Sequence, residues 1–169
     1  MNLSLVSLNT LKLNKDKIIK ISKLKDSQWR FGINSQLEWF KNNIKRNDIH
    51  NLLYNKSKLI GYTLLRRRSF NNNNLLKKKY ILFDTLIIHK DYRNKKLSKL
   101  LMIFNNMIIR ETGLFSFLIC KNDAVGFYKR FDWIKLNKKN IKVVDHKFST
   151  NGMLFNTNKV KKYYFYFNK

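Results

Sequence analysis

YILFDTLIIHKDYRNKKLSKLL, at residues 80–101, contains three patterns in succession. Residues 80–88 are apolar except for Asp84 and Thr85, which is typical of a strand covered on both faces. A short polar turn, residues 89–96, follows. Apolar residues then recur at the spacing of one helix face, at Leu97, Leu100, Leu101, Phe104, Met107 and Ile108. The stretch therefore predicts a buried strand, a turn and an amphipathic helix.

The turn itself is basic, because Arg93, Lys95 and Lys96 lie within it. The first backbone N–H groups of a helix have no acceptor inside the helix, and the helix dipole favours an anion beside them. A strand, a basic turn and a helix N-terminus together are typical of a phosphate-binding arrangement. We therefore expect this turn to bind an anion.

Composition is that of an ordinary globular protein. With 44% hydrophobic residues, the 169 residues are expected to form one domain. No stretch approaches the roughly 18 apolar residues of a membrane helix, and residues 1–13 lack the pattern of a signal peptide. Cys120 is the only cysteine and the three histidines are scattered, so neither a disulfide nor a metal site is predicted. A cytoplasmic location is the expectation.

The formal net charge of +26 has two interpretations. One is a polyanionic partner, namely nucleic acid, a ribosomal surface or an acidic membrane. The other is an A+T-rich genome, since Lys, Asn, Ile, Phe and Tyr are abundant, Pro is absent and Gly occurs 5 times. The triplet Arg66-Arg67-Arg68 fits either a solvated strand end or a nucleic-acid contact.

The N-terminal half predicts strands and one clear helix. Strands are expected at residues 48–55, at residues 59–68 and at one or both of residues 3–8 and 17–21. The helix is predicted from Ser35 to about Arg46, with Ser35 and Glu38 as a capping box. Gly61, inside a strand, indicates a bulge or a close backbone approach.

After residue 101 the central helix is expected to end near Arg110, with Gly113 as its stop. Asp123 is predicted to cap a short helix over residues 124–130. Residues 71–74 are predicted to form the tip of a hairpin. Further strands are expected at residues 114–120, 133–136, 141–144, 153–155 and 163–167. Two apolar strands joined through a long helix predict a parallel pair, so the fold class is α+β with a mixed sheet.

Residues 91–98 resemble the pyrophosphate-binding turn of the GNAT superfamily of acyl-CoA-dependent N-acyltransferases. That turn typically reads (Gln/Arg)-x-x-Gly-x-(Gly/Ala), between a strand and a helix. Here Lys96 and Ser98 occupy the two small positions, and Asn94 stands where many members have a further glycine. Side chains at Asn94 and Lys96 would crowd the pyrophosphate unless they point away while their N–H groups face it.

A second resemblance to the family covers residues 118–133. Asn122 follows a strand, and Phe127 and Tyr128 lie in a short helix that ends before the aromatic Trp133. The motifs together cover residues 91–133, whereas a compatible order of elements covers most of the chain. The resemblance implies a three-layer architecture, with a mostly antiparallel sheet, a central splayed pair of parallel strands and helices on both faces.

The resemblance also implies an activity, which is transfer of an acetyl or acyl group from acetyl-CoA, as co-substrate, to a primary amine. The amine would belong to a small molecule, a peptide or a protein. The residues implied in cofactor binding are Leu86, Ile87, Ile88, Arg93, Asn94, Lys95, Lys96, Leu97, Ser98, Asn122 and Phe127.

Proton transfer needs an acid and a base. The resemblance implies that Tyr128 is the acid for the departing CoA thiolate, although it also fits an aromatic packed beside Phe127. Asp84, on the central strand, is the leading candidate base, or alternatively a structural or exposed carboxylate, and the other candidates are Glu38, Asp48 and Asp123. A different hypothesis is a catalytically degenerate GNAT-fold module that binds RNA or a ribosomal surface through its basic face.

Overall fold

The structure is a computed structural model that describes residues 1–71, 78–145, 150–157 and 162–168. The chain forms two compact units. The first unit contains Met1–Arg66 and Thr85–Asn105, and the second contains Arg67–Asp84 and Asn106–Lys169. That residues 1–169 form a single domain stays a prediction.

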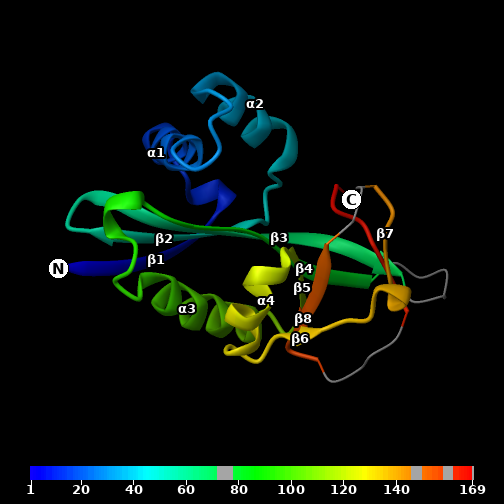
Figure 1. Ribbon diagram of the computed structural model, residues 1–169. Helices are drawn as coiled ribbons and strands as arrows, with labels where there is room; N and C mark the ends of the chain where they lie inside the picture. Colours follow the sequence, from blue (N-terminus) through cyan, green and yellow to red (C-terminus); the bar gives the residue numbers. More distant parts are fainter. Residues whose placement is uncertain (72–77, 146–149, 158–161, 169) are drawn as a thin grey trace. The chain divides into compact units, whose positions relative to one another are not determined.

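Figure 1 shows the helices and strands of the chain, coloured by their order in the sequence. Within the described residues the helices are α1 (Lys15–Asp26), α2 (Ile33–Asn43), α3 (Leu97–Glu111) and α4 (Asn122–Lys129). The strands are β1 (Leu3–Asn9), β2 (Ile49–Asn55), β3 (Lys58–Asn71), β4 (Lys78–Ile88), β5 (Ser116–Cys120), β6 (Ile134–Lys135), β7 (Ile141–Val143), β8 (Asn151–Phe155) and β9 (Tyr163–Phe165). No helix in this part of the chain has both the length and the apolar character needed to cross a membrane.

The first unit is a sheet covered on both faces. β1, β2 and β3 pair antiparallel, and β4 follows β3 in the strand order. Because side chains alternate along a strand, the neighbours Leu52 and Leu53 of β2 face opposite sides. Leu52 packs in one cluster with Ile21 of α1, whereas Leu53 packs in another with Leu97 and Leu101 of α3. Helices on both faces are therefore confirmed (Figure 1).

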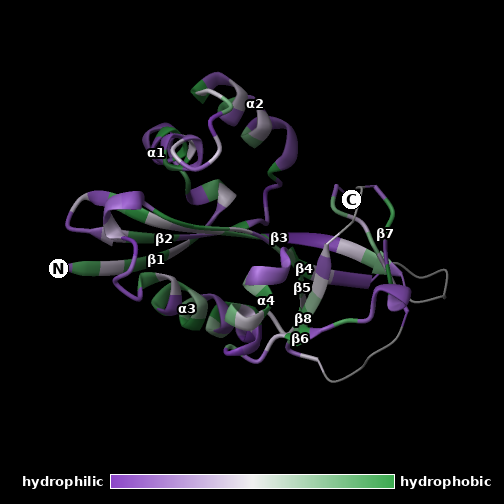
Figure 2. Cartoon of the chain, in the orientation of Figure 1, coloured by the Kyte–Doolittle hydropathy of each residue, from purple (hydrophilic) through white to green (hydrophobic). Residues whose placement is uncertain are grey.

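The helix α3 is amphipathic, as its sequence predicts. Hydrophobic and hydrophilic residues alternate around its turns in Figure 2. It ends at Glu111, and Gly113 stops it with a φ of 67° while its N–H donates to the Arg110 carbonyl at 3.0 Å. This end is the glycine stop that the sequence predicts.

The second unit contains the parallel pair. β4 and β5 are parallel, with Ile81 opposite Ser116 and Leu82 opposite Phe117. β8 pairs antiparallel with both β5 and β6, and β9 pairs antiparallel with β3 and parallel with β7. The predicted α+β class, with a mixed sheet and a parallel pair, is confirmed.

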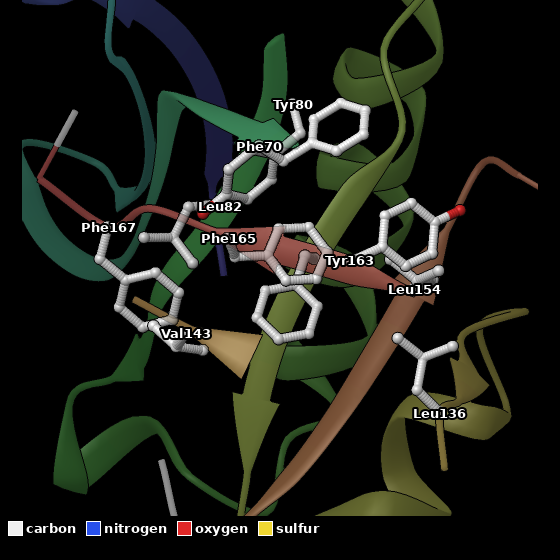
Figure 3. Packing of buried hydrophobic residues seen from close by; sticks show 10 residues of the cluster. Phe70, Tyr80, Leu82, Leu136, Val143, Leu154, Tyr163, Phe165 and Phe167 are labelled. Atoms are coloured by element: carbon white, nitrogen blue, oxygen red, sulfur yellow. The ribbon is translucent and has the colours of Figure 1, made fainter. Parts of the chain in front are cut away.

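Aromatic rings fill the core of the second unit (Figure 3). The Phe117 and Phe165 rings stack with centroids 3.9 Å apart, and Tyr80 and Phe165 lie 4.8 Å apart. Arg68 is fully buried, and its Nε donates to the Phe167 carbonyl at 2.8 Å. Buried arginine is held here by backbone acceptors, so both sequence-based interpretations of the triplet are wrong for Arg68.

Of the two alternatives for the first strand, residues 3–8 are confirmed as part of β1. Residues 17–21 instead belong to α1, where the Asn14 side chain accepts from the Lys17 N–H at 3.0 Å. Two local predictions are wrong. The capping box is absent from α2, because the helix begins at Ile33 and Gly32 precedes it without a side-chain cap. Asp123 does not cap α4, since Lys121 occupies that position and Asp123 lies in the first turn. Each error has the same cause, which is that periodicity locates an element better than its ends.

Gly61 marks both a bulge and a close approach, as predicted. The register between β2 and β3 shifts beside Leu53, which pairs with Gly61. A Cβ atom on Gly61 would lie 3.0 Å from both Ile88 Cδ1 and Leu101 Cδ1. This missing side chain lets α3 pack closely on the sheet of the first unit. Of the predicted hairpin tip, residues 72–74 lie outside the described residues.

Candidate functional site

The turn between β4 and α3 is built by two residues with left-handed backbone. β4 ends where the His89 N–H donates to the Ile60 carbonyl at 2.8 Å, and the short 3-10 turn Lys90–Tyr92 follows. Asn94 then has a φ of 62° and Lys96 a φ of 58°. Both values lie in the left-handed region, which favours glycine. The chain therefore keeps the backbone of a glycine turn without the glycines.

The backbone N–H groups of this turn are available to a ligand. In the part of the chain that the structure describes, the N–H groups of residues 94–98 donate to no protein acceptor. They include the first N–H groups of α3, where the helix dipole adds partial positive charge. Donors without protein acceptors at a helix N-terminus are suited to bind an anion.

A pocket of about 410 Å³ lies at this turn, within the first unit. It is lined by Ile88, Tyr92, Arg93, Asn94, Lys96, Leu97 and Ser98. Leu97 is buried, whereas Asn94 and Lys96 are exposed, so the pocket has an apolar base and a polar, cationic edge. Such a lining can bind a ligand in which an anionic group lies next to an apolar one.

The Arg93 side chain connects the turn to β4 and to Gln28 through hydrogen bonds. Its Nε donates to the Ile88 carbonyl at 3.3 Å, and its guanidinium also donates to the side chain of Gln28. Tyr92, which sequence reasoning did not single out, lies beneath two ammonium groups, with Lys58 Nζ 5.4 Å and Lys95 Nζ 5.3 Å from its ring centroid. Of these two contacts, the sequence signals only the one with Lys95, three residues after Tyr92 in the same basic turn.

In the second unit, Tyr128 of α4 lies in an aromatic cluster. Its ring centroid is 5.2 Å from that of Phe127, 6.1 Å from that of Phe83 and 6.1 Å from that of Trp133. Burial, with a smaller contribution from the Cys120 thiol, raises the pKa of Tyr128 to about 12. Its hydroxyl forms no hydrogen bond with another described residue. Tyr128 is thus a protonated donor in an apolar setting.

Asn122 is oriented by a residue distant in sequence. Its Oδ1 accepts from Asn151 Nδ2 of β8 at 2.7 Å, which leaves the Asn122 amide NH2 group as its donor. Asn151 was missed because it lies in the part of the sequence with the weakest pattern. Cys120 Sγ contacts Met153 Sδ at 3.7 Å, and burial raises the pKa of its thiol. A raised pKa disfavours the thiolate, so Cys120 is unsuited to act as a nucleophile.

Asp84 is exposed on β4, between the buried residues Phe83 and Thr85. Phe127 is half-buried, and its ring lies 5.2 Å from those of both Tyr128 and Phe131. Packing alone accounts for the Phe127 side chain. Neither position decides a role in chemistry, so the assignments of these two residues stay predictions.

The predicted cofactor residues of the first unit fall into two sets. Most of them line the pocket at the turn, namely Ile88, Arg93, Asn94, Lys96, Leu97 and Ser98. Lys95 instead lies over the Tyr92 ring, while Ile87 packs in the cluster beneath α1 and Leu86 against the cluster beneath α3. Among the described residues, no group of three His, Cys, Asp or Glu side chains is placed to hold a metal ion.

Comparison with known proteins identifies the fold. No protein-family model and no curated protein sequence matches the chain. An acyl-CoA N-acyltransferase of Pseudomonas aeruginosa superposes with a TM-score of 0.67 at 11% identity, covering 90% of this chain and 98% of that one. The chain has the GNAT fold. Escherichia coli ElaA gives 0.63 at 14% identity over 90% and 98% of the two chains. Arabidopsis thaliana Naa50, in complex with the bisubstrate analogue CoA-Ac-MVNAL, gives 0.64 at 14% over 93% and 100%.

In this GNAT fold, glycine substitutions at Lys96 and Lys99 should change stability in opposite directions. Lys96→Gly removes the strain of a left-handed backbone at a residue with a side chain, but it also raises the entropy of the unfolded chain. The net effect should be a gain of up to about 1 kcal/mol in the free energy of unfolding. Lys99→Gly, in α3 just after the turn, should lose roughly 0.5–1 kcal/mol. Urea unfolding of both variants measures the change, and equal losses would show that the Lys96 side chain itself stabilises the turn.

Proposed function

We propose that the protein is an N-acetyltransferase that moves an acetyl group from acetyl-CoA to a primary amine of a small molecule, peptide or protein. The observation that carries the proposal is the pocket at the β4–α3 turn, where the N–H groups of residues 94–98 have no acceptor among the described residues. The GNAT fold supports it at the level of architecture. The Naa50 complex supports a peptide amine as one class of acceptor.

The turn residues would hold the diphosphate of acetyl-CoA. A diphosphate needs several donors and positive charge, which the N–H groups of residues 94–98, the start of α3 and Lys96 supply. Lys96 has the left-handed backbone that a glycine would adopt, so the turn can follow the course of a glycine turn although the glycine is absent. Backbone at residues 86–88 would pair with the extended arm of the cofactor, and the Asn122 amide would donate to it.

Tyr128 would supply a proton to the departing sulfur. Acetyl-CoA, when bound, supplies an acetyl group activated as a thioester. The pKa of Tyr128 is about 12, whereas that of a free thiol is about 8.5. Complete transfer of the proton from the phenol to a free thiolate would therefore cost roughly 5 kcal/mol. Donation would therefore accompany cleavage of the carbon–sulfur bond, with Tyr128 hydrogen-bonded to the sulfur as charge develops.

The amine must lose a proton before or during attack. An alkylammonium has a pKa of about 10.4, so a base or a chain of water molecules must accept that proton. Asp84 is the candidate in this chain, since it is an exposed carboxylate on β4, two residues before the backbone assigned to the cofactor arm. Water could reach an exposed carboxylate and relay the proton to it.

The alternative is a degenerate module that binds RNA or a ribosomal surface. The net charge of +26 favours it. Burial of Arg68 against the Phe167 carbonyl removes one cation of the arginine triplet from any such surface. A comparison of acetyl-CoA binding with RNA binding separates the two hypotheses more directly than the net charge does.

Acetyl-CoA should stabilise the protein against thermal unfolding. At a concentration one hundred times the dissociation constant, the expected gain is about 2.7 kcal/mol. Lys96→Glu places a carboxylate at the diphosphate and should weaken binding by about tenfold or more. Lys15→Glu, on α1 outside the pocket lining, controls for the same change in net charge. Stabilisation by RNA but not by millimolar acetyl-CoA would contradict the enzyme and support the module.

Tyr128→Phe should lower kcat by about 10²-fold or more while the affinity for acetyl-CoA stays near that of the wild type. The matched control is Tyr164→Phe on β9, which removes a hydroxyl with no assigned role. Single-turnover kinetics make chemistry the measured step. An unchanged single-turnover rate would remove Tyr128 from the mechanism.

Asp84→Asn should shift the pH dependence of kcat/KM. An amide cannot accept the proton of the amine, so activity should need a higher pH, at which more of the amine is already neutral. The measurement is a pH–rate profile of the variant beside the wild type. Superimposable profiles would assign Asp84 a structural role only.

A further inference from the structure

A second pocket lies in the first unit, apart from the β4–α3 pocket. Its volume is about 250 Å³. Its residues come from α1, from the turn between β2 and β3, and from the end of β4, namely Lys20, Lys23, Leu24, Ser27, Ser57, Lys58, Leu59 and His89. None of these lining residues is acidic, although the pocket contains three lysines. A concave site with so one-sided a charge favours an anionic ligand.

The lysines of this pocket are weakly engaged by the protein. Lys20 Nζ pairs with Asp16 at 2.8 Å, but both side chains are about half exposed or more, and such pairs contribute little. Lys58 lies over the Tyr92 ring at 5.4 Å. Lys23 is exposed and forms no ion pair with any described residue. At least two ammonium groups can therefore turn to a ligand at little cost to the fold.

The rest of the lining adds one available serine hydroxyl, a histidine ring and an apolar floor. Because the Ser27 hydroxyl donates to the Leu24 carbonyl at 2.7 Å, Ser57 is the lining serine whose hydroxyl remains to donate to an anion. Nδ1 of His89 lies 3.4 Å from the Asp91 N–H and 3.6 Å from its carboxylate, so Nε2 is the ring nitrogen left for a ligand. Leu24 and Leu59 are both buried and form the floor.

We propose that this pocket binds a phosphate monoester whose organic part rests on the leucine floor. A phosphate monoester carries nearly two negative charges and three strong acceptor oxygens near neutral pH. Lys23 and Lys58 supply the charge as mobile point cations, and Ser57 with His89 supplies hydrogen bonds. A carboxylate would leave one of the cations unbalanced, whereas a monoester matches the charge and the number of donors.

Two kinds of molecule could supply the phosphate monoester, given the position of this pocket. The pocket adjoins the β4–α3 pocket, because Ile88 lines one and His89 the other, and Lys58 contacts Tyr92 of the first. The monoester is therefore either the 3′-phosphate of a CoA molecule held at the turn or a separate phosphorylated ligand. Only the first source rests on the proposed function.

Adenosine 3′-monophosphate is the probe for the site itself. Calorimetric titration should show binding that weakens at least about tenfold in the double variant Lys23→Gln and Lys58→Gln, since each removes a charged donor. Both lysines are exposed, so the variant should fold normally. Lys15→Gln, on the same helix but outside the lining, is the control. No binding by the wild type, or an equal loss in the control, would overturn the proposal.

A second titration in saturating acetyl-CoA separates the two sources. Loss of the probe's binding, together with tighter binding of acetyl-CoA than of its 3′-dephospho form, assigns the pocket to the cofactor's own phosphate. Retained binding assigns it to a separate ligand. If acetyl-CoA fails to bind while the probe still depends on Lys23 and Lys58, the acetyltransferase proposal fails and the phosphate site stands.

Discussion

The left-handed backbone at Asn94 and Lys96 is the constraint on which the pocket at the β4–α3 turn depends. It redirects the chain from β4 into α3 while the N–H groups of residues 94–98 find no acceptor in the described part of the chain. Side chains make this conformation costly, by about 1–2 kcal/mol for an ordinary residue. Burial of Leu97 and Leu101 against the sheet contributes more than that, at about 1.5–3 kcal/mol for each such side chain. Packing of α3 therefore holds a turn that its own residues disfavour.

Gly61 makes that packing possible. Because it has no side chain, Ile88 of β4 and Leu101 of α3 approach its backbone closely. Gly61 thus helps to position the two elements that the turn of residues 89–96 connects. A fold can keep the course of a loop by fixing the elements at both ends, provided that each intervening residue can adopt the required φ.

Basic charge matters here through its placement. The linings of the two pockets described above contain lysine or arginine and no acidic residue, in a chain with only 10 Asp and Glu residues. Conversely, Arg68 and Lys25 are buried and serve the interior, so the number of cations overstates the basic surface. Charge on this protein is better understood pocket by pocket than as a single net value.

The sequence by itself determined the segments whose local pattern and tertiary role agree. The strand, turn and helix of residues 80–101, the strand that ends at Cys120 and the helix that carries Tyr128 are of this kind, because burial imposes a period that the sequence must show. Tertiary structure alone decided that Asn151 orients Asn122 and that Lys23, Lys58 and His89 line one pocket. Those relations join residues far apart in the chain, and local periodicity contains no information about which distant segments become neighbours.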